Sequence, residues 1–304
     1  MSIINLNEIS LNVSRGIARI GEIYDENWLE RSSLKAPEEV VKAIVSAGAK
    51  IDIFTFMQTL SEASPKYGYY MEWDNVAVIR LATFDEWWAG LPQATRKNVR
   101  RSAKRGVNTK VVEFNDELVK GIVNIYNETP VRQGRYFWHY GKDFDTVKRE
   151  NATYLSKCDF IGAYLNDELI GFIKVVYVGQ AAKIMQIISM VRHQDKRPTN
   201  ALIAKTVEIC EKRQMKYFTY GKYIYGKRTN TPIIEFKNRN GFKMIEIPRY
   251  YIPVSNRGRI VLKLRLHHGI AGLIPVKLNN YLIDVRTKWY ERKMKGEEEG
   301  GNGN

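Results

Sequence analysis

Apolar and polar residues alternate in two short runs near the start of the chain, at 9–13 and 18–24, a pattern typical of half-buried β-strands. Two later runs, at 50–58 and 67–81, are rich in β-branched and aromatic residues and are separated by a turn-forming stretch, so they are also predicted to be strands. Between the second and third runs, residues 37–49 place apolar positions at helical spacing, with a proline suited to the first turn and acidic residues beside it. The first part of the chain is therefore predicted to mix strands with helix.

A longer succession of elements follows. Residues 159–191 divide into three apolar runs joined by tight turns, which predicts three consecutive antiparallel strands. A basic loop then leads into an amphipathic helix at 201–215. After this helix come a strand at 216–223, a short helix at 232–241 and a last strand at 242–254. A strand and a helix precede the series, so the whole chain is predicted to be α/β, of the α+β kind.

Composition indicates a folded protein. The 304 residues are 44% hydrophobic and 12% aromatic, enough for a sizeable core, and no segment approaches the ~20 apolar residues of a membrane-spanning helix. Two cysteines, Cys158 and Cys210, are too few for a disulfide scaffold or a four-cysteine zinc site. The first residues lack the pattern of a secretion signal, so we expect a cytoplasmic protein.

The net charge of +15 is unevenly distributed. Residues 1–85 hold 8 basic and 12 acidic side chains, net −4, which leaves net +19 for residues 86–304. The densest basic run, at 94–107, predicts a helix that presents cations over much of its surface and ends at a glycine. Such a helix either binds a polyanion or is a solvated face. In the first case, Arg100 and Arg101 are candidate contacts to the phosphates of a substrate.

Residues 132–144 gather aromatic and basic side chains around two glycines. Aromatic residues in a loop either cover a ligand or pack as ordinary hydrophobic side chains. A histidine in the loop is either a base or acceptor contact, or a surface side chain. The candidate substrate-binding residues here are Arg132, Arg135, Tyr136, Trp138 and His139.

Three stretches resemble the GNAT acyltransferase fold, and within it the FemAB-type branch of acyl and aminoacyl transferases built from two such domains. The first is the basic helix at 94–107, and the second is the loop, helix and strand at 192–221. The third is the EFKNRNGF run at 235–242, in which Asn240 stands where the family usually has an aromatic residue. The resemblance covers residues 86–254, and before them only the order of elements matches.

The resemblance implies a GNAT-like mixed, mainly antiparallel sheet flanked by helices, arranged as two GNAT-like units of which the C-terminal one is better preserved. The expected parts are a degenerate GNAT-like domain at 1–106 that ends in the basic helix, an acyltransferase domain at 107–256, a basic extension at 257–295 and a disordered tail at 296–304.

The resemblance also implies a donor site in the loop at 192–200. This loop lacks the glycines with which GNAT proteins usually bring backbone N–H groups to a pyrophosphate, but cationic side chains bind phosphate as well. The candidate cofactor-binding residues are Arg192, His193, Gln194, Lys196, Arg197, Thr199 and Asn200.

Few side chains are expected to take part in catalysis. Lys237, in the family's Phe-Lys signature, would stabilise charge on a leaving group or intermediate, and Tyr220 or Tyr223 would act as a general acid. A surface lysine and structural tyrosines are the alternatives. We expect no metal, because no cluster of His, Cys and carboxylates has metal-ligand spacing, and the adjacent His267 and His268 are assigned no role.

These features predict an N-acyltransferase that moves an acyl group, most simply acetyl, from acyl-CoA to an amine of a sugar nucleotide, glycan or cell-wall precursor. The expected partner is thus a phosphate-bearing acceptor. One alternative is FemAB-type transfer from aminoacyl-tRNA, and another is a non-catalytic GNAT-like binding module. Residues 260–294 alternate apolar and basic side chains, which predicts either peripheral contact with the inner face of the membrane or helices packed on the domain.

Overall fold

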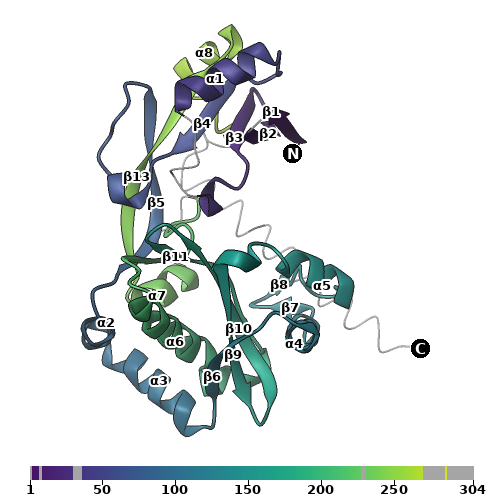
Figure 1. Cartoon of the computed structure of the whole chain (residues 1–304), viewed down its shortest axis with the longest axis vertical. Helices are drawn as coiled ribbons and strands as arrows, with labels where there is room; N and C mark the ends of the chain where they lie inside the picture. Colours follow the sequence, from purple (N-terminus) through teal and green to yellow (C-terminus); the bar gives the residue numbers. More distant parts are fainter. Residues whose placement is uncertain (1, 7–8, 30–35, 227–230, 270–284, 286–304) are drawn as a thin grey trace. The chain divides into compact units, whose positions relative to one another are not determined.

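The computed structural model describes residues 2–6, 9–29, 36–226, 231–269 and 285. This part of the chain forms two compact units (Figure 1). The described residues up to 76, together with 224–226 and 244–269, make the first unit, and residues 77–223 and 231–243 make the second.

The first unit is a mixed sheet with helices. Its strands are hydrogen-bonded in the order β1-β2-β3-β4-β13-β5. The β3–β4 pair is parallel, whereas β1–β2, β2–β3 and β4–β13 are antiparallel. The elements are β1 (Ser2–Leu6), β2 (Ile9–Arg15), β3 (Arg19–Ile23), α1 (Pro37–Ser46), β4 (Ile53–Met57), the first part of β5 (Tyr70–Arg80), β13 (Lys243–Pro253) and α8 (Asn256–Lys263), with short 3₁₀ turns at Glu26–Trp28 and Leu60–Glu62.

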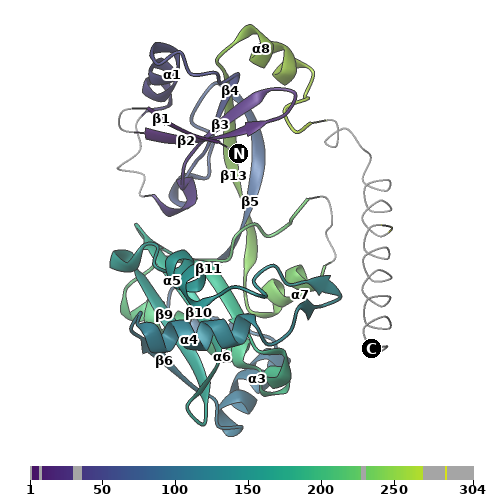
Figure 2. The same cartoon turned by 90° about the vertical axis from the view of Figure 1, so that its right-hand side faces the viewer.

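Side-chain alternation along β4 places a helix on each face of this sheet. Phe54 is fully buried in a cluster with Val40 of α1, whereas its neighbour Ile53 is buried in a second cluster with Val261 of α8. Successive residues of a strand point to opposite faces. Helices α1 and α8 therefore cover opposite faces of the sheet (Figure 2).

The second unit contains a longer run of elements. They are the end of β5, α2 (Phe84–Gly90), α3 (Gln93–Lys104), β6 (Asn108–Val112), α4 (Asp116–Tyr126), β7 (Val131–Arg132), β8 (Arg135–Tyr136), α5 (Phe144–Asn151), η4 (Leu155–Lys157), β9 (Cys158–Leu165), β10 (Glu168–Val178), β11 (Ala181–Ser189), η5 (Val191–Lys196), α6 (Pro198–Lys212), β12 (Tyr217–Thr219) and α7 (Pro232–Arg239).

The sheet of the second unit has the order β5-β12-β11-β10-β9-β6. Its pairs are antiparallel except for β11 with β12, which are parallel. Helices α4 and α5 lie on one side of these strands, and α3 and α6 lie on the other (Figure 1). Strand β10 is buried almost throughout because it is central and covered on both faces.

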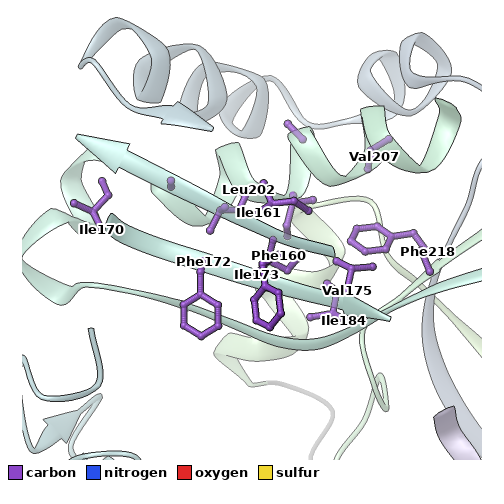
Figure 3. Close-up of a cluster of buried hydrophobic side chains, with 14 of the residues drawn as sticks. Phe160, Ile161, Ile170, Phe172, Ile173, Val175, Ile184, Leu202, Val207 and Phe218 are labelled. Atoms are coloured by element: carbon purple, nitrogen blue, oxygen red, sulfur yellow. The ribbon is translucent and has the colours of Figure 1, made fainter. Parts of the chain in front are cut away.

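Aromatic and β-branched side chains from the strands and α6 form the core of this unit (Figure 3). Phe172 and Ile173 on β10, Leu202 and Val207 on α6 and Phe218 on β12 are all fully buried. The predicted amphipathic helix thus places its apolar face on the predicted strands, as its spacing requires.

The predicted fold class is confirmed: the chain is mixed α/β, with a large, mainly antiparallel sheet flanked by helices. The basic helix is also confirmed as α3, which ends before Gly106 in the left-handed conformation. The sequence analysis missed β1, α5 and the β7–β8 hairpin, which are short and lack a clear apolar period.

Helix α8 falls at the start of the predicted C-terminal extension, but most of that extension and the predicted tail at 296–304 lie outside the described residues. None of the helices in the described part of the chain has the length and hydrophobicity needed to cross a bilayer.

Asp52 anchors the start of α8. Its backbone oxygen accepts hydrogen bonds from the N–H groups of Val254 and Ser255, and its carboxylate binds the Ser255 hydroxyl and the Arg19 side chain. Gly258 approaches so closely that a Cβ there would lie 1.9 Å from the Asp52 backbone oxygen. Only glycine therefore fits this contact.

We predict that Gly258→Ala lowers the free energy of unfolding by about 1–3 kcal/mol or more, because backbone must shift to admit the methyl group. Gly68→Ala is the matched control, since a Cβ there meets nothing within 4 Å, and should change stability by less than about 0.5 kcal/mol. Urea unfolding of both variants measures the difference. Equal stability of the two variants would contradict the close approach.

Candidate functional site

Strand β11 leaves its neighbour β12 after only three residue pairs. Ala181–Lys183 pair with Tyr217–Thr219, but β11 continues to Ser189, and no described strand pairs with that edge beyond Lys183. On its other edge β11 stays paired with β10 to its end. The second half of β11 therefore has a free edge of backbone donors and acceptors within the sheet.

A β-bulge lies at the start of this free edge. Lys174 pairs with Gln186 and Val175 pairs with Ile184, so Met185 is the extra residue of β11. Bulges bend a strand and re-aim its side chains, and they are common beside active sites. Residues 185–189 are only half-buried, unlike the fully buried residues opposite them on β10. An extended ligand could add here as a further strand.

The free edge leads directly to the start of a long helix. After Ser189 the chain passes through η5, adopts a left-handed conformation at Arg197 and enters α6 at Pro198. The Arg197 side chain makes no capping hydrogen bond. Helix starts attract anions through their N–H groups and dipole. A phosphate carried by a ligand on β11 would thus meet the N-terminus of α6.

Most cations predicted to hold the donor are paired with carboxylates. Arg192 and His193 both contact Glu168. The loop residue Asp195 accepts from Lys196 over 3.3 Å and from Arg105, which directly follows α3, over 2.6 Å. The exposed Arg197 and Gln194 have no ion pair or side-chain hydrogen bond among the described residues. Arg197 is therefore the predicted cation best placed to meet a phosphate at α6.

Two polar side chains of the first turn of α6 tie the loop in place. The Thr199 hydroxyl lies 3.0 Å from the hydroxyl of Ser189 at the end of β11. The Asn200 amide donates to the side-chain oxygen of Asn240, just after α7, over 3.0 Å. These predicted donor-binding residues thus connect β11, α6 and α7.

Lys237 is fully buried, so the alternative of a surface lysine is wrong. Its ammonium donates to the backbone oxygen of Lys222 over 2.5 Å and lies 4.6 Å from the ring centre of Tyr220. Burial lowers the pKa of Lys237 to about 8. The Tyr220 ring also packs on Phe236, while Tyr223 is half-buried against the same core. Lys237 and both tyrosines therefore share the region that follows β12.

Arg132 is largely engaged within the protein. Its guanidinium donates to the backbone oxygens of Ser189, over 2.8 Å, and Ile125, over 2.6 Å, and lies over the Phe137 ring. It also lies 3.5 Å from Glu128, whose carboxylate accepts the backbone N–H groups of η5. Arg132 thus fixes the end of β11 and the entry to the loop, and its charge is largely compensated.

The other residues of the predicted aromatic loop divide into exposed and buried ones. Arg135 and Tyr136 form the exposed strand of the β7–β8 hairpin, and Trp138 is exposed with the Lys142 ammonium 3.8 Å from its ring centre. His139 is buried, so the surface alternative is wrong for it. The exposed members are available to an acceptor, whereas His139 faces the sheet.

His139 meets β11 through a residue that the sequence analysis missed. The Gln186 amide nitrogen lies 3.2 Å from His139 Nε2 and donates to the Tyr126 hydroxyl over 2.5 Å. Burial, aided by the Lys142 and Arg132 charges, lowers the pKa of His139 to about 4. The imidazole is therefore neutral near pH 7. The one sequence signal for Gln186 was its polar side chain within the apolar run of β11.

Helix α3 packs along α6 and reaches the donor loop through the Arg105–Asp195 ion pair. Arg100 lies over the Trp88 ring, 5.6 Å from its centre. Lys97, Arg101 and Lys104 are exposed, and no ion pair to them occurs in the described part of the chain. The predicted basic surface thus exists and adjoins the predicted donor loop.

Comparison with protein-family models and with curated proteins found no match in sequence. In structure the chain is similar to the C-terminal domain assigned to a lysylphosphatidylglycerol synthetase from Agrobacterium fabrum, with a TM-score of 0.55, 13% identity, and 87% of this chain and 88% of that chain covered.

It is also similar to FemX, with a TM-score of 0.56, 10% identity and coverage of 84% and 85%. For L-PGS from Bacillus licheniformis the TM-score is 0.52, with 11% identity and coverage of 87% and 86%. Together with the order of elements around β11 and α6, these likenesses show that the chain has a GNAT-like fold.

The depressed pKa of His139 predicts a loss of stability in mild acid. In the unfolded chain a histidine titrates near pH 6.5. Between about pH 6.5 and 4 the unfolded chain therefore binds a proton at His139 that the folded protein does not bind. The neutral His139 therefore contributes on the order of 2–3 kcal/mol to the free energy of unfolding. This contribution is fully present above pH 6.5 and is lost as the pH falls to 4. Urea unfolding over this range should show a steeper fall for the native protein than for His139→Gln. Parallel curves would contradict the buried neutral imidazole.

Proposed function

We propose that this protein transfers an acyl group from a coenzyme A thioester to an amine of a phosphate-bearing acceptor, such as a sugar nucleotide, glycan or cell-wall precursor. The observation that carries the proposal is the free edge of β11, which runs from the bulge at Met185 to the start of α6. A donor with an extended amide-containing arm and a pyrophosphate matches both features, since the arm can pair with β11 and the pyrophosphate can meet the helix.

The proposed reaction joins the acceptor nitrogen to the carbonyl carbon as the carbon–sulfur bond breaks. The amine loses one proton, and the departing thiolate takes one up. Backbone N–H groups along β11 would stabilise the developing oxyanion. Tyr220 and Tyr223, at the end of β12, are the proposed proton donors to the thiolate. Lys237 positions this segment through the Lys222 carbonyl.

The exposed side chains of the aromatic segment, Arg135, Tyr136 and Trp138, are the proposed acceptor contacts. An aromatic face suits a sugar or base, and an arginine suits a phosphate. Arg132 and His139 position the nearby part of β11 instead, because Arg132 binds the Ser189 carbonyl and His139 contacts the Gln186 amide.

A second candidate donor is aminoacyl-tRNA, which would put the protein in the FemAB-like branch. Two observations favour it. Helix α3 carries a row of exposed cations, and the loop at 192–200 beside it has no glycine and has most of its own cations paired with carboxylates. The name of one similar structure, a lysylphosphatidylglycerol synthetase, describes an aminoacyl product. The reaction at β11 would be the same, with a ribose oxygen in place of sulfur.

We predict that Lys237→Met lowers kcat at least about a hundredfold while the thermal unfolding temperature changes little, because methionine fills the space but cannot hold the Lys222 carbonyl. The assay follows release of free thiol from acetyl-CoA in the presence of UDP-glucosamine and related amino-sugar nucleotides. Full activity in Lys237→Met would contradict the role of Lys237. Absence of thiol release by the native protein with every acyl-CoA and amine would contradict the thioester donor.

Charge reversal on α3 separates the two donors. If tRNA binds there, Arg101→Glu with Lys104→Glu should weaken tRNA binding more than tenfold and flatten its salt dependence. If coenzyme A is the donor, the same change should alter the Michaelis constant for acetyl-CoA by less than about threefold. Lys212→Glu with Lys216→Glu is the charge-matched control, at the far end of α6. Equal tRNA affinity of the two double variants would contradict the tRNA surface.

A further inference from the structure

Two of the chain's four histidines converge on a single carboxylate in the first unit. His267 and His268 follow α8, and Glu72 lies on β5, 195 positions away from His267 along the chain. His267 Nε2 lies 2.9 Å from one oxygen of Glu72, and His268 Nε2 lies 2.6 Å from the other. This distance in sequence is why the spacing of residues predicted no metal site.

The three side chains offer two imidazole nitrogens and one carboxylate, and their ligand atoms are spaced closely enough for a zinc site. Their ligand atoms all lie within 4.8 Å of one another. Around a tetrahedral Zn²⁺ with bonds of about 2.0–2.1 Å, neighbouring ligand atoms are about 3.3 Å apart. The two nitrogen–oxygen distances would thus need to open by only about 0.4–0.7 Å to admit the ion, a change within side-chain rotation.

The surroundings fix two of the three ligands in place. The Tyr70 hydroxyl donates to Glu72 over 3.1 Å, as hydroxyl groups do behind metal-binding carboxylates. The His267 side chain is fully buried, with its ring centre 4.7 Å from that of Tyr251.

The cluster is closed on one side and open on the other. His267 Nδ1 is buried and finds no partner among the described residues. His268, in contrast, is half-exposed. Neutral imidazoles are metal ligands, and the exposed side gives an ion a path of entry.

We propose that Glu72, His267 and His268 bind one Zn²⁺, with a water molecule as the fourth ligand. Two imidazole nitrogens with one carboxylate and an open position suit zinc better than magnesium or calcium, which prefer oxygen ligands. The ion would fasten the segment after α8 to β5. Its residues all belong to the first unit, whereas those of the proposed transferase chemistry belong to the second.

The first test is zinc binding by the tag-free, full-length protein, measured by competition with a fluorescent chelator. We expect one Zn²⁺ per chain, bound at least about tenfold more weakly by Glu72→Gln and by His268→Ala. His193→Ala is the matched control, because His193 also lies beside a carboxylate, Glu168, but without a second histidine. It should bind zinc as the native protein does.

The second test needs no variant. X-ray absorption at the zinc edge of the loaded native protein should show only nitrogen and oxygen ligands, at about 2.0–2.2 Å. Circular dichroism checks that the two variants are folded, and His268→Ala truncates a half-exposed side chain. The proposal is overturned if no stoichiometric zinc binds, if sulfur ligates the zinc, or if both folded variants bind zinc as tightly as the native protein. In the first case the cluster is a hydrogen-bonded triad only.

Discussion

The early separation of β11 from β12 is the constraint on which the rest of this site depends. Three parallel residue pairs join the two strands, and beyond them β10 is the one strand of the described chain that pairs with β11. Buried backbone groups must be satisfied by hydrogen bonds. Apart from the Ser189 carbonyl, which accepts from Arg132, no described strand or side chain pairs with this edge beyond Lys183, so it is a natural place for an extended ligand. The bulge at Met185 and the start of α6 define its two ends.

The polar groups around this edge are held by contacts that the core makes rigid. Arg132 binds the Ser189 carbonyl, Gln186 binds His139, and Lys237 binds the Lys222 carbonyl. Each contact fixes a backbone or side-chain position near the free edge of β11 and is itself at least partly buried. Burying such groups is unfavourable unless they are hydrogen-bonded, so their pairing stabilises one arrangement of the strands over others.

The order of elements could be predicted from the sequence because it rests on local patterns. The three apolar runs in 159–191, joined by tight turns, and the amphipathic spacing after them predicted the strands and helix that form the core. Contacts between distant residues left no such pattern. Lys237 had the sequence surroundings of a surface lysine, and it is buried only because α7 packs against the segment after β12. Glu72 and His267 likewise meet only through the fold.

Hydrogen–deuterium exchange of the native protein, with and without acetyl-CoA, tests the central claim most directly. Among residues 184–189 of β11, the amides that face away from β10 should exchange more slowly with the donor bound, as should those of the first turn of α6, because the ligand would pair with them. The same amides should be protected by aminoacyl-tRNA if that is the donor. Unchanged exchange along β11 with both donors, or protection confined to other segments, would contradict the account.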